Sequence, residues 1–447
     1  MFPLQGPYRN LEPQFALDQR LVQLTIAVDS HSGQNYGMNK TVKVKWKIIL
    51  TGSRERAAWS YIEKLDKEIN DLEERFRKTP HFHLFTAGFG ASLFSYYLYR
   101  VTGQKKYFKR AHSFIDMSVN AIGKVSVGDQ LYSGFTGTAW LVEHIRHTSK
   151  KSWTKKTDPN REIDEYLLNK LKSGIKSKLP LRAYGLVDDW VGYGVYGIER
   201  LDHAKTSAFI RQMVNFLKIK SKSTRDGTSW YTPKKFVPLE QKAEYKNGYF
   251  NIGVAHGVPG VIGFLGEVLK SDSKNKLVRD LLRSAIEWLV HQDCASHYGF
   301  QIPPKDAMDQ LKQKVRLAWC YGDLGISIVL LNVSRILRDP KLEARAMEIA
   351  TRSSLFTEVD SGIADPYFCH GGIGAFHGFN RLYQGTNDEI FLENALKWVD
   401  VTFKLIEKSQ NTEKEFNLLT GKTGVGISLL AGVSTITPEW DRFLLMS

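Results

Sequence analysis

The sequence predicts an all-α fold: an α/α toroid (barrel) of seven double-helical hairpin repeats, with a small N-terminal β-containing extension. Three observations support this prediction. A glycine turn of the form G-x-x-G recurs along the 447 residues, an apolar helical stretch follows each copy, and an amphipathic stretch precedes the next copy. We expect residues 1–55 to form the extension, which could be a β-hairpin, and residues 56–447 to form the toroid.

The glycine turn has seven copies, whose last glycines are spaced from 47 residues (Gly90 to Gly137) to 65 residues (Gly260 to Gly325). Such intervals hold two helices and their connections. Glycine permits the close backbone approach needed where inner helices pack around one axis. The helix N-termini then point to one end of the toroid. The copies are Ala87–Gly90, which is degenerate, and Gly134–Gly137, Gly194–Gly197, Gly257–Gly260, Gly322–Gly325, Gly371–Gly374 and Gly421–Gly424.

The stretches between the turns divide into two kinds. Residues 260–269 are apolar on more than one face and are expected to be buried, whereas residues 277–292 and 342–352 carry apolar residues at helical spacing on one face. Residues 54–78 predict a charged helix. Residues 21–28 and 41–50 alternate as strands do. Two longer intervals, 226–250 and 300–314, are interpreted as loops or short strands over the active face.

The composition is that of a soluble globular chain, with 42% hydrophobic and 24% charged residues. No apolar run is long enough for a membrane span and the first residues lack a signal-peptide pattern. Only three cysteines occur, which favours a reducing, cytoplasmic setting. The net charge of +15 indicates a solvated basic surface or attraction to an acidic peptide or the inner face of the cell membrane. No nucleic-acid-binding motif is present, so no nucleic-acid partner is expected.

Three metal-ligating side chains lie on two equivalent turns. Cys320 is two residues before the glycine of its turn, and Cys369 and His370 occupy the matching loop of the next turn along the chain. Three such donors suit a Zn²⁺ site that keeps its fourth position open. Two thiolates neutralise the ion, so a third, substrate thiolate would be activated yet stay electron-rich enough to attack. The alternative, two buried apolar cysteines, does not explain the matched positions.

Other polar residues precede the same turns. His256 directly precedes its glycine and is the candidate general acid/base. Arg316, four residues before the first cysteine ligand, either forms a surface ion pair or orients a carboxylate or enolate. Tyr321 either donates a hydrogen bond near the zinc or packs. Asp188 and Asp189 precede the third turn, and one of them is expected at the mouth of the toroid.

The remaining candidates lack this setting. Cys294 is expected in the core, because no glycine motif surrounds it. His377 lies inside a predicted inner helix and is expected in the core or behind the ligands. The paired histidines are expected to be non-ligands: His81, His83, His144 and His147.

Three motifs together resemble the signature of the lanthionine synthetase C family, the lantibiotic cyclases and LanC-like proteins. They are Trp-Cys-Tyr-Gly at 319–322, Cys-His-Gly-Gly at 369–372 and Ala-His-Gly-Val-Pro-Gly at 255–260, and the resemblance covers residues 80–435. It implies an α/α barrel of seven repeats. It also implies the Michaelis addition of a peptide cysteine thiol to dehydroalanine or dehydrobutyrine, which forms a lanthionine or methyllanthionine thioether in lantibiotic biosynthesis.

The resemblance also implies roles for single residues. The family's zinc ligands fall on Cys320, Cys369 and His370, its acid/base histidine on His256, and its active-site arginine and tyrosine on Arg316 and Tyr321. The implied partners are a dehydrated precursor peptide and, at the membrane, a dehydratase and an exporter.

The family's aspartate lies four residues before the glycine of its third turn. Counted from Gly194, that position is Trp190, and counted from Gly192 it is Asp188. A one-residue insertion gives Asp189, which we favour because two apolar residues follow it.

Three other functions compete with the peptide cyclase. A LanC-like protein could add glutathione or another small thiol to dehydroamino acids. The tyrosine after Cys320 and the two glycines after His370 favour the cyclase over this alternative. A zinc hydrolase is disfavoured, because two thiolates lower the pKa of bound water less. A non-catalytic scaffold is disfavoured by the presence of His256 and Arg316.

Overall fold

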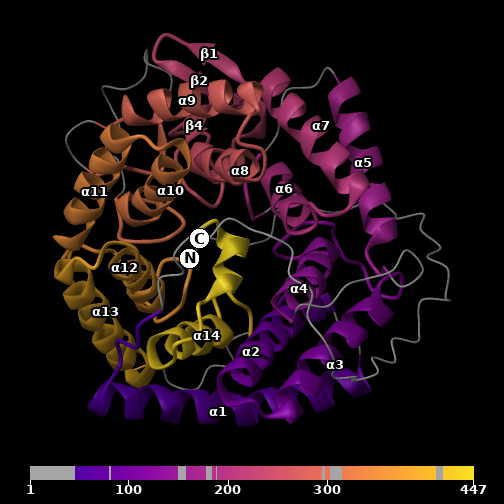
Figure 1. Cartoon of the computed structure of the whole chain (residues 1–447), viewed down its shortest axis with the longest axis vertical. Helices are drawn as coiled ribbons and strands as arrows, with labels where there is room; N and C mark the ends of the chain where they lie inside the picture. The colour runs from indigo at the N-terminus through magenta and orange to yellow at the C-terminus, as the bar shows by residue number, and fades with distance from the viewer. Residues whose placement is uncertain are drawn as a thin grey trace.

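The computed structural model describes residues 46–79, 82–149, 158–177, 184–187, 189–293, 297–302, 315–408 and 416–447. Within them, α-helices form two concentric rings (Figure 1), which confirms the predicted α/α toroid of seven double-helical repeats. The inner ring holds α2 (Ala87–Thr102), α4 (Phe135–Thr148), α6 (Trp190–Glu199), α8 (Val258–Ser271), α10 (Asp323–Leu337), α12 (Gly372–Thr386) and α14 (Lys422–Val433). The outer ring holds α1 (Gly52–Lys78), α3 (Lys105–Ala121), α5 (Arg161–Lys176), α7 (Ala204–Lys220), α9 (Lys276–Val290), α11 (Pro340–Ser354) and α13 (Glu389–Lys408).

The two rings differ in burial as their sequences predict. Every residue of α14 from Thr423 to Val433 is buried, whereas α9 buries one face that includes Leu282 and Leu289. Each inner helix contacts the next one, and α14 contacts α2, so the inner ring is closed. Burial of a leucine side chain contributes about 1.5–3 kcal/mol. Packing of the inner helices against their outer partners therefore contributes to the stability of the ring.

The N-terminal part of the described chain closes the outer ring. Helix α1 packs on α14, which lacks a later outer partner, and it contains the charged helix predicted over residues 54–78. It begins at Gly52, inside the segment assigned to the extension. The strand expected over residues 41–50 is wrong in its described part, 46–50. There the amides of Ile49 and Leu50 both donate to the Gly432 carbonyl at the end of α14 (3.0 Å) instead of pairing with a strand. Residues 1–45, including the expected strand 21–28, lie outside the described residues.

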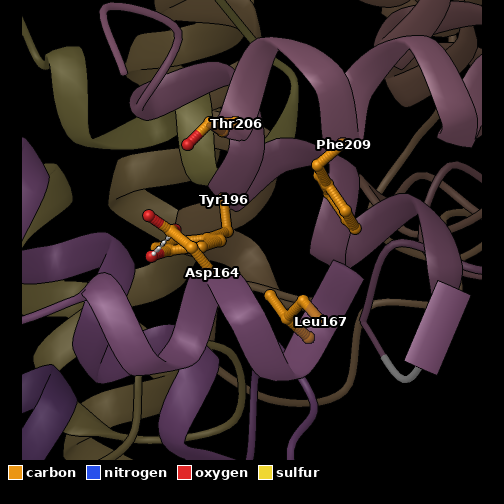
Figure 2. A pocket seen from close by; sticks show the side chains of 5 residues that line it. All are labelled: Asp164, Leu167, Tyr196, Thr206 and Phe209. Carbon is orange, nitrogen blue, oxygen red and sulfur yellow. Dashed lines mark hydrogen bonds between the residues drawn. The ribbon is translucent and has the colours of Figure 1, made fainter. Parts of the chain in front are cut away.

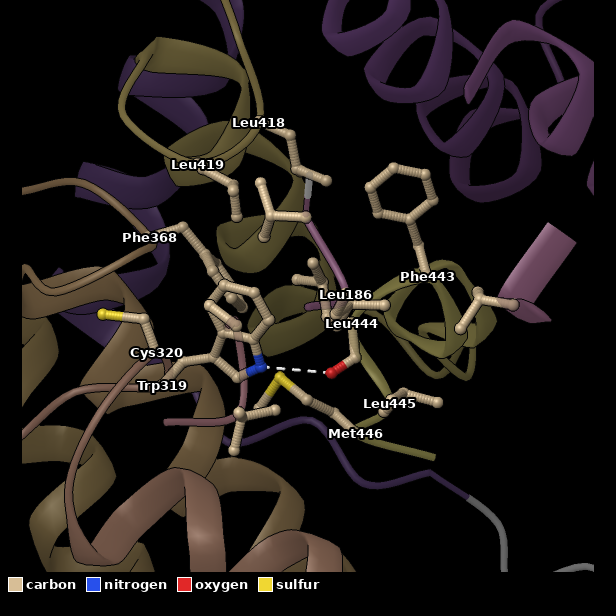
Figure 3. Packing of buried hydrophobic residues seen from close by; sticks show 14 of the residues in the cluster. Leu186, Trp319, Cys320, Phe368, Leu418, Leu419, Phe443, Leu444, Leu445 and Met446 are labelled. Carbon is tan, nitrogen blue, oxygen red and sulfur yellow. Dashed lines mark hydrogen bonds between the residues drawn. The ribbon is translucent and has the colours of Figure 1, made fainter. Parts of the chain in front are cut away.

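The C-terminal segment fills the centre of the ring (Figure 1), where η6 (Glu439–Leu444) follows α14. The Phe443 ring packs against Phe89 of α2 and Trp140 of α4, with centroids 4.9 Å apart in both pairs. Further along, Leu445 faces Gly263 of α8. The lumen is therefore a packed core and not a channel (Figure 3).

Two small sheets interrupt the helical pattern. Strands β1 (Lys222–Thr224) and β2 (Gly227–Ser229) form an antiparallel hairpin. Strands β3 (Tyr231–Thr232), β4 (Tyr249–Asn251) and β5 (Gln301–Ile302) form an antiparallel sheet in that order, with η3 (Lys234–Phe236) and η4 (Leu239–Gln241) between β3 and β4. These elements confirm the short strands expected in the two long intervals. Residues 303–314 lie outside the described residues.

Polar packing stabilises the wall between α4, α5 and α6. The buried Arg200 guanidinium forms ion pairs with Glu143 (2.6 Å), Asp158 (2.8 Å) and Asp164 (2.5 Å). Figure 2 shows a hollow beside this network that cannot hold a water molecule, and no predicted site residue lines it. Its lining residues are Asp164, Leu167, Tyr196, Thr206 and Phe209. No helix in the described part of the chain is long and apolar enough to cross a membrane.

Candidate metal centre

Six of the turns before the inner helices share one close approach of the backbone to itself. A Cβ on the last glycine of a copy would lie within 2.5 Å of the carbonyl oxygen six residues earlier, so only glycine fits. This holds at Gly137, Gly192, Gly260, Gly325, Gly374 and Gly424.

The third copy therefore ends at Gly192, and the predicted register Gly194–Gly197 is wrong. Gly194 instead approaches the Phe264 ring, and Gly197 approaches Phe209 and Ile210. In this register Asp189 takes the place of the first glycine, and it is the N-cap residue of α6.

A belt of main-chain hydrogen bonds joins successive turns. Before the caps of α4, α6, α8, α10 and α12, the residue two positions earlier donates its N–H to the carbonyl of the equivalent residue in the next repeat. These bonds run from Tyr132 to Val187 (3.3 Å), Val187 to Ala255 (3.2 Å), Ala255 to Cys320 (3.4 Å), Cys320 to Cys369 (3.3 Å) and Cys369 to Leu419 (2.8 Å).

A side chain closes the belt. The Leu419 amide lies 3.4 Å from the Tyr132 hydroxyl, which donates to Asn417 Oδ1 at 2.7 Å. The belt fixes the backbones of Cys320 and Cys369 side by side. It also shows that these inner helices all begin at one end of the toroid.

The predicted ligands come together at this end. One ligand atom from each of Cys320, Cys369 and His370 lies within 4.8 Å of the others, and no other group of this kind occurs among the described residues. Cys320 is buried, whereas Cys369 and His370 are partly exposed. The three donors therefore lie at an accessible mouth, above a buried layer that includes the neighbouring residues Trp319 and Phe368 (Figure 3).

The electrostatics of the group fit a divalent cation. The hydrogen bond from Cys369, followed by that from His370, lowers the pKa of the Cys320 thiol well below its usual range. The same thiolate and burial raise the pKa of Cys369 well above its usual range, and the thiolate also raises the pKa of His370. Without a metal ion, Cys320 therefore holds its proton less tightly than Cys369 does. A Zn²⁺ ion suits this donor set, because it would stabilise the second thiolate as well.

The other predicted residues surround the ligands. The Tyr321 ring lies 6.1 Å from the His256 ring, measured between centroids, and its hydroxyl accepts a hydrogen bond from Asn251 Nδ2 at 3.0 Å. The Tyr321 ring is stacked on the Phe300 ring, with centroids 4.6 Å apart. The Arg316 guanidinium lies 4.4 Å from the centroid of the Phe300 ring. The positive charge of Arg316 helps to lower the pKa of Cys320. His256 and Phe300 therefore both lie beside the Tyr321 ring, and Arg316 lies over Phe300, near enough to Cys320 to act on its charge.

Of the two aspartate candidates, only Asp189 lies among the described residues. Asp189 caps α6 through its backbone carbonyl, which accepts from the Gly192 amide at 2.9 Å. Asp188 lies outside the described residues. In the corrected register Asp188 occupies the position that His256, Tyr321 and His370 occupy in their own repeats. The choice between the two stays a prediction.

The histidines expected to be non-ligands lie apart from the group where they are described. His144 is buried between Tyr97 and Trp140, and His147 pairs with Glu199. His377 is buried and bound to Asp441 at 2.8 Å, which confirms its expected place in the core. His81 and Cys294 lie outside the described residues.

Sequence reasoning missed three residues at the mouth: Asn251, Phe300 and Asp365. Asp365 lies 3.7 Å from His370 Nε2 and is placed to orient its ring. Asn251 and Asp365 share a signal with Arg316, because each lies six residues before the first glycine of its turn. Phe300 has no such signal, since it comes from the inserted sheet.

Fold and site define the class: an α/α toroid with a Cys-Cys-His group where the inner helices begin. The chain belongs to the lanthionine synthetase C-like protein family, whose model matches residues 80–445. It is similar to the nisin biosynthesis protein NisC of Lactococcus lactis subsp. lactis, with 24% identity over 308 residues that span 65% of this chain and 71% of that protein. A solved nisin cyclase structure shares the fold at a TM-score of 0.71 and 20% identity, covering 86% of this chain and 97% of that one.

Proposed function

We propose that this protein is a zinc-dependent peptide cyclase. It adds a cysteine thiol of a dehydrated precursor peptide to a dehydroalanine or dehydrobutyrine of the same peptide. The sulfur forms a bond to the β-carbon, the thiol proton is released, and a proton is added at the α-carbon, so no mass is lost. The observation that carries this proposal is the grouping of Cys320, Cys369 and His370 at an accessible mouth.

The donor set supports zinc and a thiol substrate. Bound by these three residues, Zn²⁺ would supply a Lewis acid that lowers the pKa of a substrate thiol at its open fourth position. Two thiolate ligands already balance the ion's charge, so a bound substrate sulfur stays nucleophilic. The same charge balance disfavours a hydrolase, in which water is the activated group.

The neighbouring residues supply the other half of the reaction. Addition at the β-carbon moves negative charge towards the carbonyl oxygen, and we assign the stabilisation of that charge to Arg316, which lies over the Phe300 ring. We assign to His256, whose ring lies 6.1 Å from that of Tyr321, the role of holding the proton and delivering it to the α-carbon. We assign the remaining carboxylate role to Asp188 or Asp189. In the corrected repeat register, Asp188 holds the place equivalent to His256.

A cyclase of this type acts inside the cell on a peptide that a dehydratase has modified and an exporter removes. The basic surface suits an acidic peptide or the inner face of the cell membrane, because the chain carries a net charge of +15. The alternative thiol donor, glutathione, differs in one measurable respect: its addition increases the mass of the product.

The test uses a synthetic peptide with one dehydroalanine and a cysteine three residues later. The purified, zinc-loaded protein is incubated with it, and a thiol-alkylating reagent is then added. We expect a product of unchanged mass that resists alkylation, and no such product from the peptide with serine in place of dehydroalanine. A cysteine that stays fully alkylatable would contradict the proposal. A glutathione adduct formed in its place when glutathione is also supplied would favour the small-thiol alternative.

A further inference from the structure

The inserted sheet reaches the metal centre through one aromatic ring. Phe300 directly precedes β5, and its carbonyl accepts a hydrogen bond from the Ile252 amide at 3.1 Å. The β4–β5 register pairs Phe250 with Ile302 and Asn251 with Gln301. Phe300 is therefore fixed to the sheet on the side where Asn251 meets Tyr321.

The ring contacts two residues of the proposed active site at once. The Arg316 guanidinium carbon lies 4.4 Å from its centroid, a cation–π distance. The Tyr321 ring is stacked on it at 4.6 Å with an angle of 27° between the planes. Arg316 is otherwise on a segment of irregular backbone, anchored by the bond from the Leu317 amide to the Ser361 carbonyl at 2.8 Å. An arginine in such a segment has many side-chain conformations, and the ring limits them.

We propose that Phe300 is a positioning residue that holds the Arg316 guanidinium and the Tyr321 ring in their working places beside the ligands. Phe300 is neither a ligand nor an acid or base. It acts because a planar guanidinium prefers the face of an aromatic ring, where its fork of N–H donors stays free to meet developing negative charge. The inference rests on the proposed cyclase function.

The test compares Phe300→Leu with Phe300→Tyr in the zinc-loaded protein, with the dehydroalanine peptide as substrate. Leucine keeps apolar bulk but removes the aromatic face, so we expect kcat to fall about 10-fold with KM changed less than about twofold. Tyrosine keeps the face and should restore kcat. Bound zinc should remain near one per chain in both variants. Phe236→Leu is the matched control, because Phe236 is a half-buried ring of the other long interval, 226–250, and also lies beneath a cation, Lys235 (4.8 Å).

A double-mutant cycle tests whether Phe300 acts through Arg316. In an Arg316→Gln background, Phe300→Leu should lower kcat by a smaller factor than in the wild type, because one of the two groups that it positions is gone. Equal effects of Phe300→Leu in both backgrounds, or a loss of kcat that tyrosine does not restore, would overturn the inference. An inactive wild-type protein would instead contradict the proposed function, so the two failures are distinguishable.

Discussion

At the residue scale, Cys320 and Cys369 have a place that a core cysteine does not need: adjacent positions of the main-chain belt beside His370. We expect Cys320→Ala to reduce bound zinc from about one ion per chain to near zero, because the two remaining protein donors hold the ion weakly. Metal analysis after dialysis measures this. Cys294→Ala is the control and should keep its zinc. Retention of zinc by the Cys320 variant would show that the group is not the metal site.

His256 has a different predicted role from the ligands. We expect His256→Gln to bind zinc normally but to lower kcat about 10²–10⁴-fold, the range that a general acid contributes. The alkylation assay and metal analysis on the same sample separate the two effects. His144→Gln at a buried position in α4 serves as a control for loss of a histidine without loss of a proton donor. Equal loss of zinc and activity in the His256 variant would make it a structural residue.

Residues beside the glycines could be predicted because the glycines occur at the turns before the inner helices. These turns lie together at the mouth of the toroid. Cys320, Cys369 and His370 were found in this way, and Asn251 and Asp365 could have been found by counting six residues back from the capping glycine. Phe300 could not be found, because its place depends on strand pairing between segments that lie about 50 residues apart, as in the Phe250–Ile302 pair.

At the scale of elements, the belt makes the turns one unit, and the Tyr132 hydroxyl is its closing bond. Tyr132→Phe removes that oxygen, so the buried Leu419 amide loses this hydrogen-bond acceptor. The Leu419 carbonyl accepts the hydrogen bond from the Cys369 amide, so the change lies close to the candidate metal site. We expect a loss of about 1–3 kcal/mol in unfolding free energy and a several-fold weaker affinity for zinc. Denaturant unfolding and competition with a chelator measure the two quantities.

Tyr184→Phe is the control for this prediction. The buried Tyr184 hydroxyl donates to the Trp230 carbonyl at 2.7 Å, outside the belt. We expect Tyr184→Phe to lower stability without a change in zinc affinity. Equal effects of the two variants on zinc affinity would mean that the belt does not preset the ligands.

Element order and type followed from the repeat, but the register of α6 did not. The helix contains three glycines, and each makes room for a different neighbour. Gly192 lies against a carbonyl oxygen, Gly194 against the Phe264 ring and Gly197 against the Phe209 ring. A sequence shows that a Cβ is missing but not what approaches it. The error placed the third turn five residues too late, which is why the aspartate position stayed open.

At the scale of the whole molecule, both ends of the described chain complete the toroid. Residues 46–78 supply the outer partner of α14, and residues 439–446 fill the lumen. The Trp319 indole N–H donates to the Leu444 carbonyl at 3.1 Å, and Trp440 packs against Phe368 at 5.5 Å. Since Trp319 and Phe368 directly precede Cys320 and Cys369, the C-terminal segment packs beneath the predicted metal site. The repeat pattern does not predict this contact, because the segment lies outside the repeats.

Asp441 anchors that segment, so the loss of its charge should lower the unfolding free energy of the whole domain. It is fully buried, bound to Arg381 at 2.5 and 2.7 Å and to His377 at 2.8 Å. Burial disfavours its charge, but Arg381 and His377 outweigh burial and lower the pKa of the carboxyl. We expect Asp441→Asn to lower the unfolding free energy by about 3 kcal/mol, because it leaves a largely buried arginine without its partner.

The contribution of Asp441 to stability should depend on pH in a definite direction. A carboxyl with a lowered pKa stabilises the fold above its ordinary pKa, about 4, and loses that contribution as the pH falls through its folded value. The difference in stability between the wild type and Asp441→Asn should therefore be full at pH 7 and shrink below about pH 4 in denaturant titrations. Asp400→Asn, which breaks the exposed pair with Arg54, should cost less than about 1 kcal/mol. If the two variants lost equal stability, the C-terminal segment would be a surface tail in solution and could not support the ligands.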